Sequence, residues 1–170
     1  MSAPALEDLL AKEEIRERLH DYVRAMDRID DELGRSVFHP DASADYGDIY
    51  RGSGHGFIAW VHAAHAAMIV HAHHLGSIAI KVDRERAVSE TYVSVTLRMA
   101  DPTGGWLDSR ASGRYLDRWE KRAGRWAIAA RHYVHEFDDL APVTNWQFAS
   151  AGRRDREDPS YVLFAGLSGG

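Results

Sequence analysis

Four long segments in the second half of the chain most constrain the fold. Each has the composition of an extended strand, and only a few turn-forming residues separate one from the next: Asp83-Arg84-Glu85, residues 101–105 and Ala123-Gly124. Short turns of this kind connect neighbouring antiparallel strands. We therefore expect an antiparallel meander, with strands over residues 71–82, 87–99, 106–121 and 125–137.

The N-terminal half has the spacing of amphipathic helices. Apolar residues recur every three or four positions between Leu6 and Asp27, which predicts a first helix there. A short helix is expected over 30–37 and a turn at His39-Pro40-Asp41, because the residue before a proline avoids the helical region. A short strand over 42–49, a loop over 51–54 and a helix over 57–68 follow.

Helices followed by a meander predict an α+β domain whose helices lie on one face of the sheet. Gly113 falls inside the third long strand, where glycine typically marks a bulge or bend. The sheet should therefore curve around the N-terminal helices as a cone-shaped barrel with an internal pocket. We expect one domain over residues 1–170, with its core at about 6–140 and a C-terminal extension over 141–170. The apolar segment 161–164 of the extension must cover another surface.

Composition excludes several classes of protein. The 170 residues are 45% hydrophobic and 28% charged, as in a soluble globular domain. Cysteine is absent, which excludes thiol nucleophiles and disulfides and is compatible with the cytoplasm. A net charge of −5 disfavours a nucleic-acid partner. Charged residues interrupt the N-terminal segment, so neither a signal peptide nor a membrane span is expected.

The histidine cluster at residues 71–74 is the first candidate functional feature. Alternation along a strand directs His71 and His73 to one face and His74 to the other. The even positions from Ile78 to Val82 are apolar and the odd ones small or polar, so His73 should share the less apolar face. That pattern fits either a pocket wall or a solvent-exposed face.

A metal site is an alternative for the histidines. His62 and His65 lie one helical turn apart, and His71 and His73 have the two-residue spacing of ligands on a strand. No pair is accompanied by a third ligand at a diagnostic spacing. We therefore expect no bound metal.

Four further residues could serve either a site or the core. Asp27 borders the apolar face of the first helix, where it is a solvated helix-end carboxylate or a carboxylate at a pocket rim. Arg131 follows Trp126 in the last strand and is directed either to the sheet edge or into the cavity. Tyr22 and Tyr46 are phenols that either pack in the core or present a hydroxyl to a ligand.

Several segments together resemble the SnoaL-like group of the nuclear-transport-factor-two-like superfamily, over residues 6–140. Enzymes of this group with similar patterns include hexachlorocyclohexane dehydrochlorinase, scytalone dehydratase and bile-acid 7α-dehydratase. The matching segments are Tyr22-Val23-Arg24-Ala25-Met26-Asp27, Phe38-His39-Pro40-Asp41-Ala42, Gly52, His73-His74-Leu75-Gly76-Ser77, Ile80-Lys81-Val82-Asp83 and Trp126-Ala127-Ile128-Ala129-Ala130-Arg131.

The resemblance implies a cone with a deep apolar pocket and elimination without a cofactor. It assigns the catalytic aspartate to Asp27 and the histidine to His73. Ser77 stands where the family often has an asparagine, so His74 is the alternative base. The resemblance also implies that Tyr22, Tyr46 and Arg131 contact the substrate.

These residue types suit proton abstraction by His73, oriented by Asp27, with loss of a leaving group such as water or return of the proton in an isomerisation. The expected substrate is a small apolar ring compound. The alternative is a cone of the same fold that binds a small molecule or forms oligomers without catalysis. We also expect a homo-oligomer, dimer or trimer, because the outer face of the sheet would otherwise remain uncovered.

Overall fold

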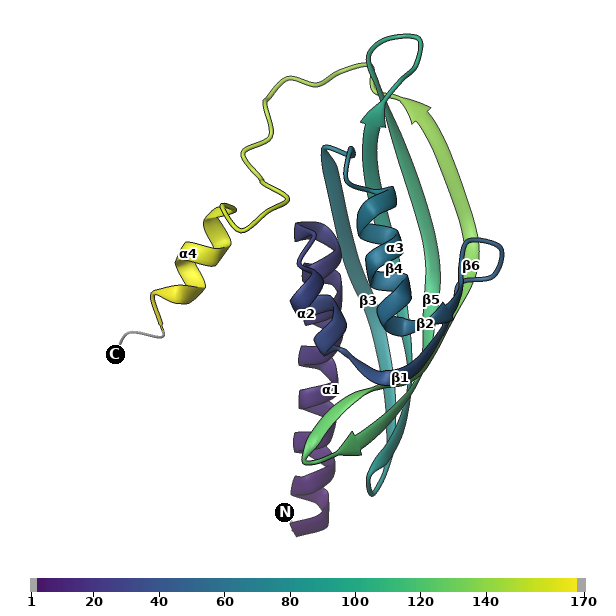
Figure 1. Cartoon of the computed structure of the whole chain (residues 1–170), viewed down its shortest axis with the longest axis vertical. Helices are drawn as coiled ribbons and strands as arrows, with labels where there is room; N and C mark the ends of the chain where they lie inside the picture. The colour runs from purple at the N-terminus through teal and green to yellow at the C-terminus, as the bar shows by residue number, and fades with distance from the viewer. Residues whose placement is uncertain (1–2, 168–170) are drawn as a thin grey trace.

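A single curved sheet forms one side of the molecule, and the N-terminal helices lie against its concave face (Figure 1). The computed structural model describes residues 3–167. The helices are α1 (Ala3–Arg28), α2 (Asp31–Ser36), α3 (Gly54–Ala64) and α4 (Pro159–Ala165). The strands are β1 (Phe38–Asp45), β2 (Arg51–Ser53), β3 (Val70–Asp83), β4 (Arg86–Ala100), β5 (Trp106–Arg122) and β6 (Arg125–Pro142).

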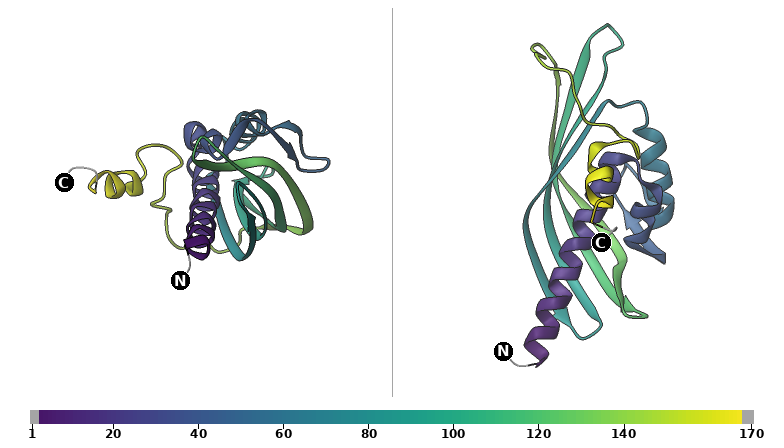
Figure 2. Two further views of the ribbon diagram at one scale, coloured as in Figure 1. Left: turned by 90° about the horizontal axis from the view of Figure 1, so that it is seen from below. Right: turned by 90° about the vertical axis from the view of Figure 1, so that its left-hand side faces the viewer.

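The strand order is β2-β1-β6-β5-β4-β3. The four long strands form the predicted antiparallel meander, and β1 adds to it by pairing parallel with β6. The α+β class and the curved sheet around the N-terminal helices are confirmed (Figure 2). The sheet stays open rather than closing into a barrel, because β2 and β3 form its two edges and α1 lies along β3.

Gly113 lies at a bulge, as predicted. The pairing of β5 with β6 shifts register between Ser112 and Gly113. A Cβ atom at this position would meet the carbonyl oxygen of Val134 and the ring of Tyr133. Only glycine allows so close an approach without displacing a neighbour, and the bulge increases the local curvature of the sheet.

A second bulge in β3 corrects one expectation. The pairing of β3 with β4 shifts register between Leu75 and Ile78. The extra residue reverses the alternation of side chains, so His71 and His73 before the bulge face the same side as Ile78 after it. His73 therefore shares the apolar inner face of the sheet. The prediction that it shares the less apolar face was wrong, because strict alternation was assumed across the bulge.

Several element boundaries differ from the predictions, among them the ends of the strand expected over 42–49 and the helix expected over 57–68, which are Asp45 and Ala64. The expected turn at His39-Pro40-Asp41 is part of β1, whose pairing with β6 is irregular between Phe38 and Ser43. A proline in a strand is tolerated at such an irregularity because no ladder hydrogen bond is lost there. The expected loop at 51–54 contains the short strand β2. Helix α3 begins earlier than expected because Ser53 caps it, accepting a 3.0 Å hydrogen bond from the Gly56 N–H.

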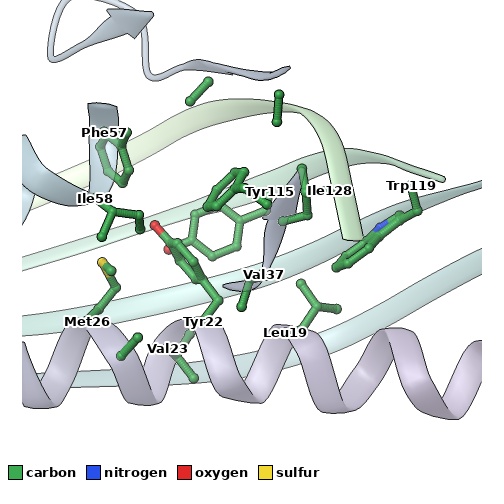
Figure 3. Close-up of a cluster of buried hydrophobic side chains, with 14 of the residues drawn as sticks. Leu19, Tyr22, Val23, Met26, Val37, Phe57, Ile58, Tyr115, Trp119 and Ile128 are labelled. Atoms are coloured by element: carbon green, nitrogen blue, oxygen red, sulfur yellow. The ribbon is translucent and has the colours of Figure 1, made fainter. Parts of the chain in front are cut away.

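The core lies between α1 and the sheet (Figure 3). Leu19, Tyr22 and Met26 rise from α1 toward the sheet, where Trp119 and Ile128 are also buried. Burial of side chains of this size contributes about 1.5–3 kcal/mol each. This packing fixes the end of α1, and hence Asp27, relative to the strands.

The C-terminal extension docks on the end of α1 and on the start of α2. Tyr161 of α4 donates a 2.8 Å hydrogen bond to Asp30, and its ring lies 4.6 Å from the Arg24 guanidinium. Val162 and Leu163 remain exposed, so the apolar segment is covered only in part. The homo-oligomer, in which these side chains would be buried, stays a prediction. Within residues 3–167, no helix has the length and apolar character needed to cross a membrane.

Candidate active site

A cavity of about 270 Å³ lies between α3 and the concave face of the sheet. Six aromatic side chains and four imidazoles contribute to its wall: Tyr22, Tyr46, Phe57, Trp60, Tyr115, Tyr133, His65, His71, His73 and His135. Aliphatic side chains of β4 complete one side. A larger hollow of about 550 Å³ lies elsewhere on the sheet, but none of the predicted site residues lines it. The smaller cavity is therefore the candidate site.

Asp27 and His73 meet at the cavity wall. The Nδ1 atom of His73 lies 2.8 Å from Oδ1 of Asp27. Because an ionised carboxylate only accepts, Nδ1 carries the hydrogen and Nε2 of neutral His73 is left with a lone pair. Both side chains are largely buried, with 9% of His73 and 18% of Asp27 exposed.

The edge position of β3 holds this pair together. An edge strand has backbone N–H groups without a partner strand. The carboxylate of Asp27 accepts the backbone N–H of His73 at 3.2 Å to each oxygen, in addition to the imidazole. Asp27 lies in the last turn of α1, which ends where Ile29 adopts a left-handed conformation with φ of 52°. Two elements distant in sequence thus bring one carboxylate to both the backbone and the ring of one histidine.

Two further histidines stay neutral beside His73. The Nδ1 atom of His71 lies 2.9 Å from the carbonyl oxygen of Met26, so Nδ1 must donate. Burial lowers the pKa of His71 to about 2. Burial, assisted by the positive charge of Arg154, lowers the pKa of His65 to about 4. At neutral pH both rings are uncharged.

Tyr22 and Tyr46 form a phenol pair in the cavity wall. Their hydroxyl oxygens are 2.7 Å apart. Burial raises the pKa of Tyr22, which Arg131 opposes in part, and burial raises the pKa of Tyr46 well above its ordinary value. Both phenols therefore keep their hydrogens at neutral pH. Only one hydrogen lies between the two oxygens, so the other is free to donate to a ligand.

Arg131 occupies neither of the positions expected for it. It forms a two-bond ion pair with Asp117 at 2.7 and 2.8 Å, and both side chains are fully buried. Its guanidinium lies 4.1 Å from the ring centre of Tyr22 and 4.0 Å from that of Tyr115. Arg131 is not among the residues that line the cavity. The predicted direct contact with substrate is corrected accordingly: Asp117 holds the cation behind the tyrosine rings.

His74 lies on the other side of β3 from His73. Its side chain is exposed and does not line the cavity. The alternation of the strand before the bulge explains this, as predicted. Of the two candidate bases, only His73 has a carboxylate partner and a place in the cavity wall.

Asp27, His71 and His73 could together hold a metal ion. One ligand atom from each residue lies within 4.8 Å of the others. A cation bound at the Nδ1 atoms would displace the hydrogens that these atoms donate to Met26 and Asp27. The expectation of a metal-free site stays a prediction.

Arg154 of the C-terminal extension was not expected at the site. Its guanidinium donates to the carbonyl oxygens of His65 at 2.6 Å and Met68 at 2.7 Å. It also donates to the last carbonyl oxygens of α1, at Asp27 (3.3 Å) and Met26 (3.4 Å). A cation at a helix C-terminus satisfies free carbonyls and interacts favourably with the helix dipole. Arg154 thereby ties the residue that orients the base to the loop that leads into β3.

Sequence reasoning also missed the aromatic wall and the partner of Arg131. Tyr115 and Tyr133 occupy inward positions of β5 and β6, and alternation from Gly113 and Arg131 would have indicated both. Asp117 lies directly opposite Arg131 in the register. No local signal indicates Arg154, because its contacts bridge 86 to 128 residues of chain.

The fold and cavity define a class of cone-shaped α+β proteins with an internal site. Residues 7–132 match the SnoaL-like domain, and the chain belongs to that family. Among curated proteins, no sequence matches this chain.

Solved structures show the same fold. A hexachlorocyclohexane dehydrochlorinase (LinA) type 2 is 14% identical with a TM-score of 0.71, covering 85% of this chain and 96% of that one. A Novosphingobium aromaticivorans protein provisionally named scytalone dehydratase is 19% identical with a TM-score of 0.68, covering 85% and 93%. A nuclear-transport-factor-2-like superfamily protein of Salmonella enterica is 25% identical with a TM-score of 0.63, covering 73% and 89%.

Proposed function

We propose that this protein is a cofactor-independent lyase that eliminates water or a similar leaving group from a small apolar ring compound. The observation that carries the proposal is the 2.8 Å contact between Asp27 and Nδ1 of His73, made where His73 forms part of the cavity wall. The aromatic lining supports a ring-shaped ligand. The names of the dehydrochlorinase and dehydratase neighbours agree with this reaction class.

Proton abstraction is the first step of the proposed reaction. Nε2 of His73 takes a proton from the carbon next to a carbonyl, and the electron pair of the C–H bond forms an enolate. Asp27 stabilises the imidazolium through the Nδ1 hydrogen bond. The free hydrogen of the Tyr22–Tyr46 pair donates to the enolate oxygen.

Loss of the leaving group completes the cycle. The enolate re-forms the carbonyl, a carbon–carbon double bond forms, and the bond to the hydroxyl on the next carbon breaks. The imidazolium of His73 returns its proton to the departing hydroxide as water, which restores the neutral base. Return of the proton to another carbon of the same substrate would give an isomerisation instead.

Arg131 contributes from behind the phenols. Its guanidinium faces the rings of Tyr22 and Tyr115. From there its positive charge stabilises the negative charge that develops on the enolate oxygen at the tyrosine hydroxyls. Asp117 balances the buried cation in the resting state. Arg131 is thus proposed to act through Tyr22 rather than on the substrate.

The test uses a panel of ring ketones with a hydroxyl or chlorine two carbons from the carbonyl carbon, such as 3-hydroxycyclohexanone and 3-chlorocyclohexanone. Elimination yields a conjugated enone, followed by its ultraviolet absorbance. Exchange of the α-hydrogen in deuterated water reports proton abstraction even when no group leaves. We expect exchange and turnover in the wild type and loss of both in His73→Ala. Absence of exchange across the panel, or exchange unchanged in His73→Ala, contradicts the proposal and favours the binding-module alternative.

A further inference from the structure

His71 is a second imidazole of the cavity wall that the proposed reaction leaves without a role. It precedes His73 by two residues on β3 and faces the same side. The two ring centres are 4.9 Å apart and the rings are perpendicular. Only 2% of the His71 side chain is exposed.

The hydrogen bonds of His71 fix what its other nitrogen can do. A carbonyl oxygen only accepts, so the 2.9 Å contact with Met26 requires the hydrogen on Nδ1. Nε2 of the neutral ring then has a lone pair and no hydrogen. Because burial holds the pKa of His71 at about 2, the ring stays neutral throughout the physiological range. Nε2 is an acceptor only.

This acceptor has no partner in the described part of the chain. No hydrogen bond to Nε2 is formed within residues 3–167, and Nε2 is not among the unpartnered polar atoms sealed from solvent, so it reaches the cavity. The wall beside it on β4 consists of Val93, Val95 and Leu97, which donate nothing. A bound ligand without a donor would cover this acceptor and leave it unpaired, which costs free energy, whereas a ligand that supplies a donor avoids the cost.

We propose that His71 selects the ligand: its Nε2 accepts a hydrogen bond from a hydroxyl carried on the ring of the bound compound. The 4.9 Å separation of the rings places this hydroxyl near the carbon from which His73 takes the proton, a distance that substituents on neighbouring ring carbons span. The position of the hydroxyl next to the reacting carbon rests on the proposed function, whereas the preference for a hydroxyl rests on the cavity alone. The ligand class is thereby narrowed from apolar rings in general to ring compounds with a hydroxyl donor.

The experiment compares 2-naphthol with 2-fluoronaphthalene, which has nearly the same shape and no hydrogen to donate. Calorimetric titration gives the dissociation constant of each. The wild type should prefer the naphthol by about ten- to a hundredfold, the range for leaving a buried acceptor unpaired. His71→Phe keeps a ring of similar size without the acceptor and should bring the ratio of the two dissociation constants close to one. His20→Phe, on the exposed face of α1, is the matched control and should keep it.

Equal binding of the two compounds by the wild type, or an unchanged preference in His71→Phe, overturns the inference. Should His71→Phe fail to fold, ¹⁵N spectra of histidine-labelled wild type replace it: naphthol should shift the unprotonated Nε2 signal of His71, and fluoronaphthalene should not. A preference that depends on His71 in a protein without any turnover supports the inference and counts against the proposed lyase. Turnover by a protein that shows no preference for the hydroxyl compound supports the proposed lyase and overturns the inference about His71.

Discussion

Among residues 3–167, two largely buried imidazoles form a hydrogen bond with an aspartate, and only one of the two lines the cavity. Asp27 and His73 join the end of α1 to β3 at 2.8 Å. Asp31 and His62 join α2 to α3 at 2.5 Å. In both pairs the Nδ1 atom faces the carboxylate, so the first contact alone does not distinguish them.

The two pairs differ in the surroundings of the second imidazole nitrogen, Nε2. Nε2 of His62 is sealed from solvent and has no hydrogen-bond partner among residues 3–167, and His62 does not line the cavity. His73 lies in the cavity wall. Asp31 is also 53% exposed, compared with 18% for Asp27. An Asp–His contact is therefore a catalytic candidate only where the free nitrogen can reach a ligand; the contact between Asp31 and His62 connects helices.

The largest expected difference between the pairs is in turnover. His73→Ala should lower kcat/KM by about a hundred- to ten-thousandfold, the usual contribution of a general base. Asp31→Asn should change it by less than about twofold, because neither Asp31 nor its partner His62 lines the cavity. Both are measured on a substrate that the wild type converts. Comparable losses in the two variants would remove the distinction between the pairs.

A double-mutant cycle examines whether Asp27 and His73 act as one unit. Asp27→Asn alone should be nearly as damaging as His73→Ala, because the amide cannot stabilise the imidazolium. Their combination should cost little more than either alone, since removing one partner already disables the pair. Asp27→Asn combined with Asp31→Asn should instead give the product of the single effects. Multiplicative losses for Asp27 and His73 would mean that the two residues act independently.

The C-terminal extension contacts the end of α1 at Asp27 and the start of α2 beside Asp31, and its two arginines allow a matched comparison. Arg154 binds carbonyl oxygens around Asp27, whereas Arg156 pairs with Asp30 at 3.0 Å beside α2. Arg154→Gln should lower kcat by about tenfold or more through displacement of Asp27, with KM nearly unchanged. Arg154→Lys should recover part of the rate, and Arg156→Gln should have little effect.

Thermal unfolding of each variant separates positioning from loss of structure. Equal losses of kcat in Arg154→Gln and Arg156→Gln would indicate that docking of the extension in general, rather than the Arg154 contacts, supports the site.

The smallest expected effect concerns the neutral imidazoles around the site pair. The pKa values of His71 and His65 are lowered from 6.5 to about 2 and about 4. Below pH 6.5 the unfolded chain therefore binds more protons than the folded one, and the free energy of unfolding falls as the pH is lowered. Each histidine contributes a slope of up to about 1.4 kcal/mol per pH unit.

Urea unfolding at a series of pH values measures this slope. His71→Phe should reduce the slope between pH 6.5 and about 4, even if the variant is less stable overall. A slope identical to that of the wild type would mean that His71 takes up a proton in the folded state.

The sequence determined the elements that depend on local signals. Apolar residues spaced three and four positions apart predicted α1, short turns predicted the meander, and Gly113 predicted a bulge. Each of these signals acts between residues close in the chain. Asp27 and His73 were matched through resemblance to a family. Their spacing gave no distance between them, since they lie on elements 46 residues apart.

Only the tertiary structure decided how the side chains face one another. Counting back from the turn at Ala123-Gly124 in a regular hairpin would place Asp117 opposite Ala130, whereas a register shift at Trp119 places it opposite Arg131. The bulge after Leu75 likewise turns Ile78 to the same face as His73. A bulge is a property of two paired strands together, and the docking of Arg154 depends on packing across the whole fold. Unlike the bulge at Gly113, the register shift at Trp119 has no glycine beside it, and the docking of Arg154 has no period or turn residue that a single sequence displays.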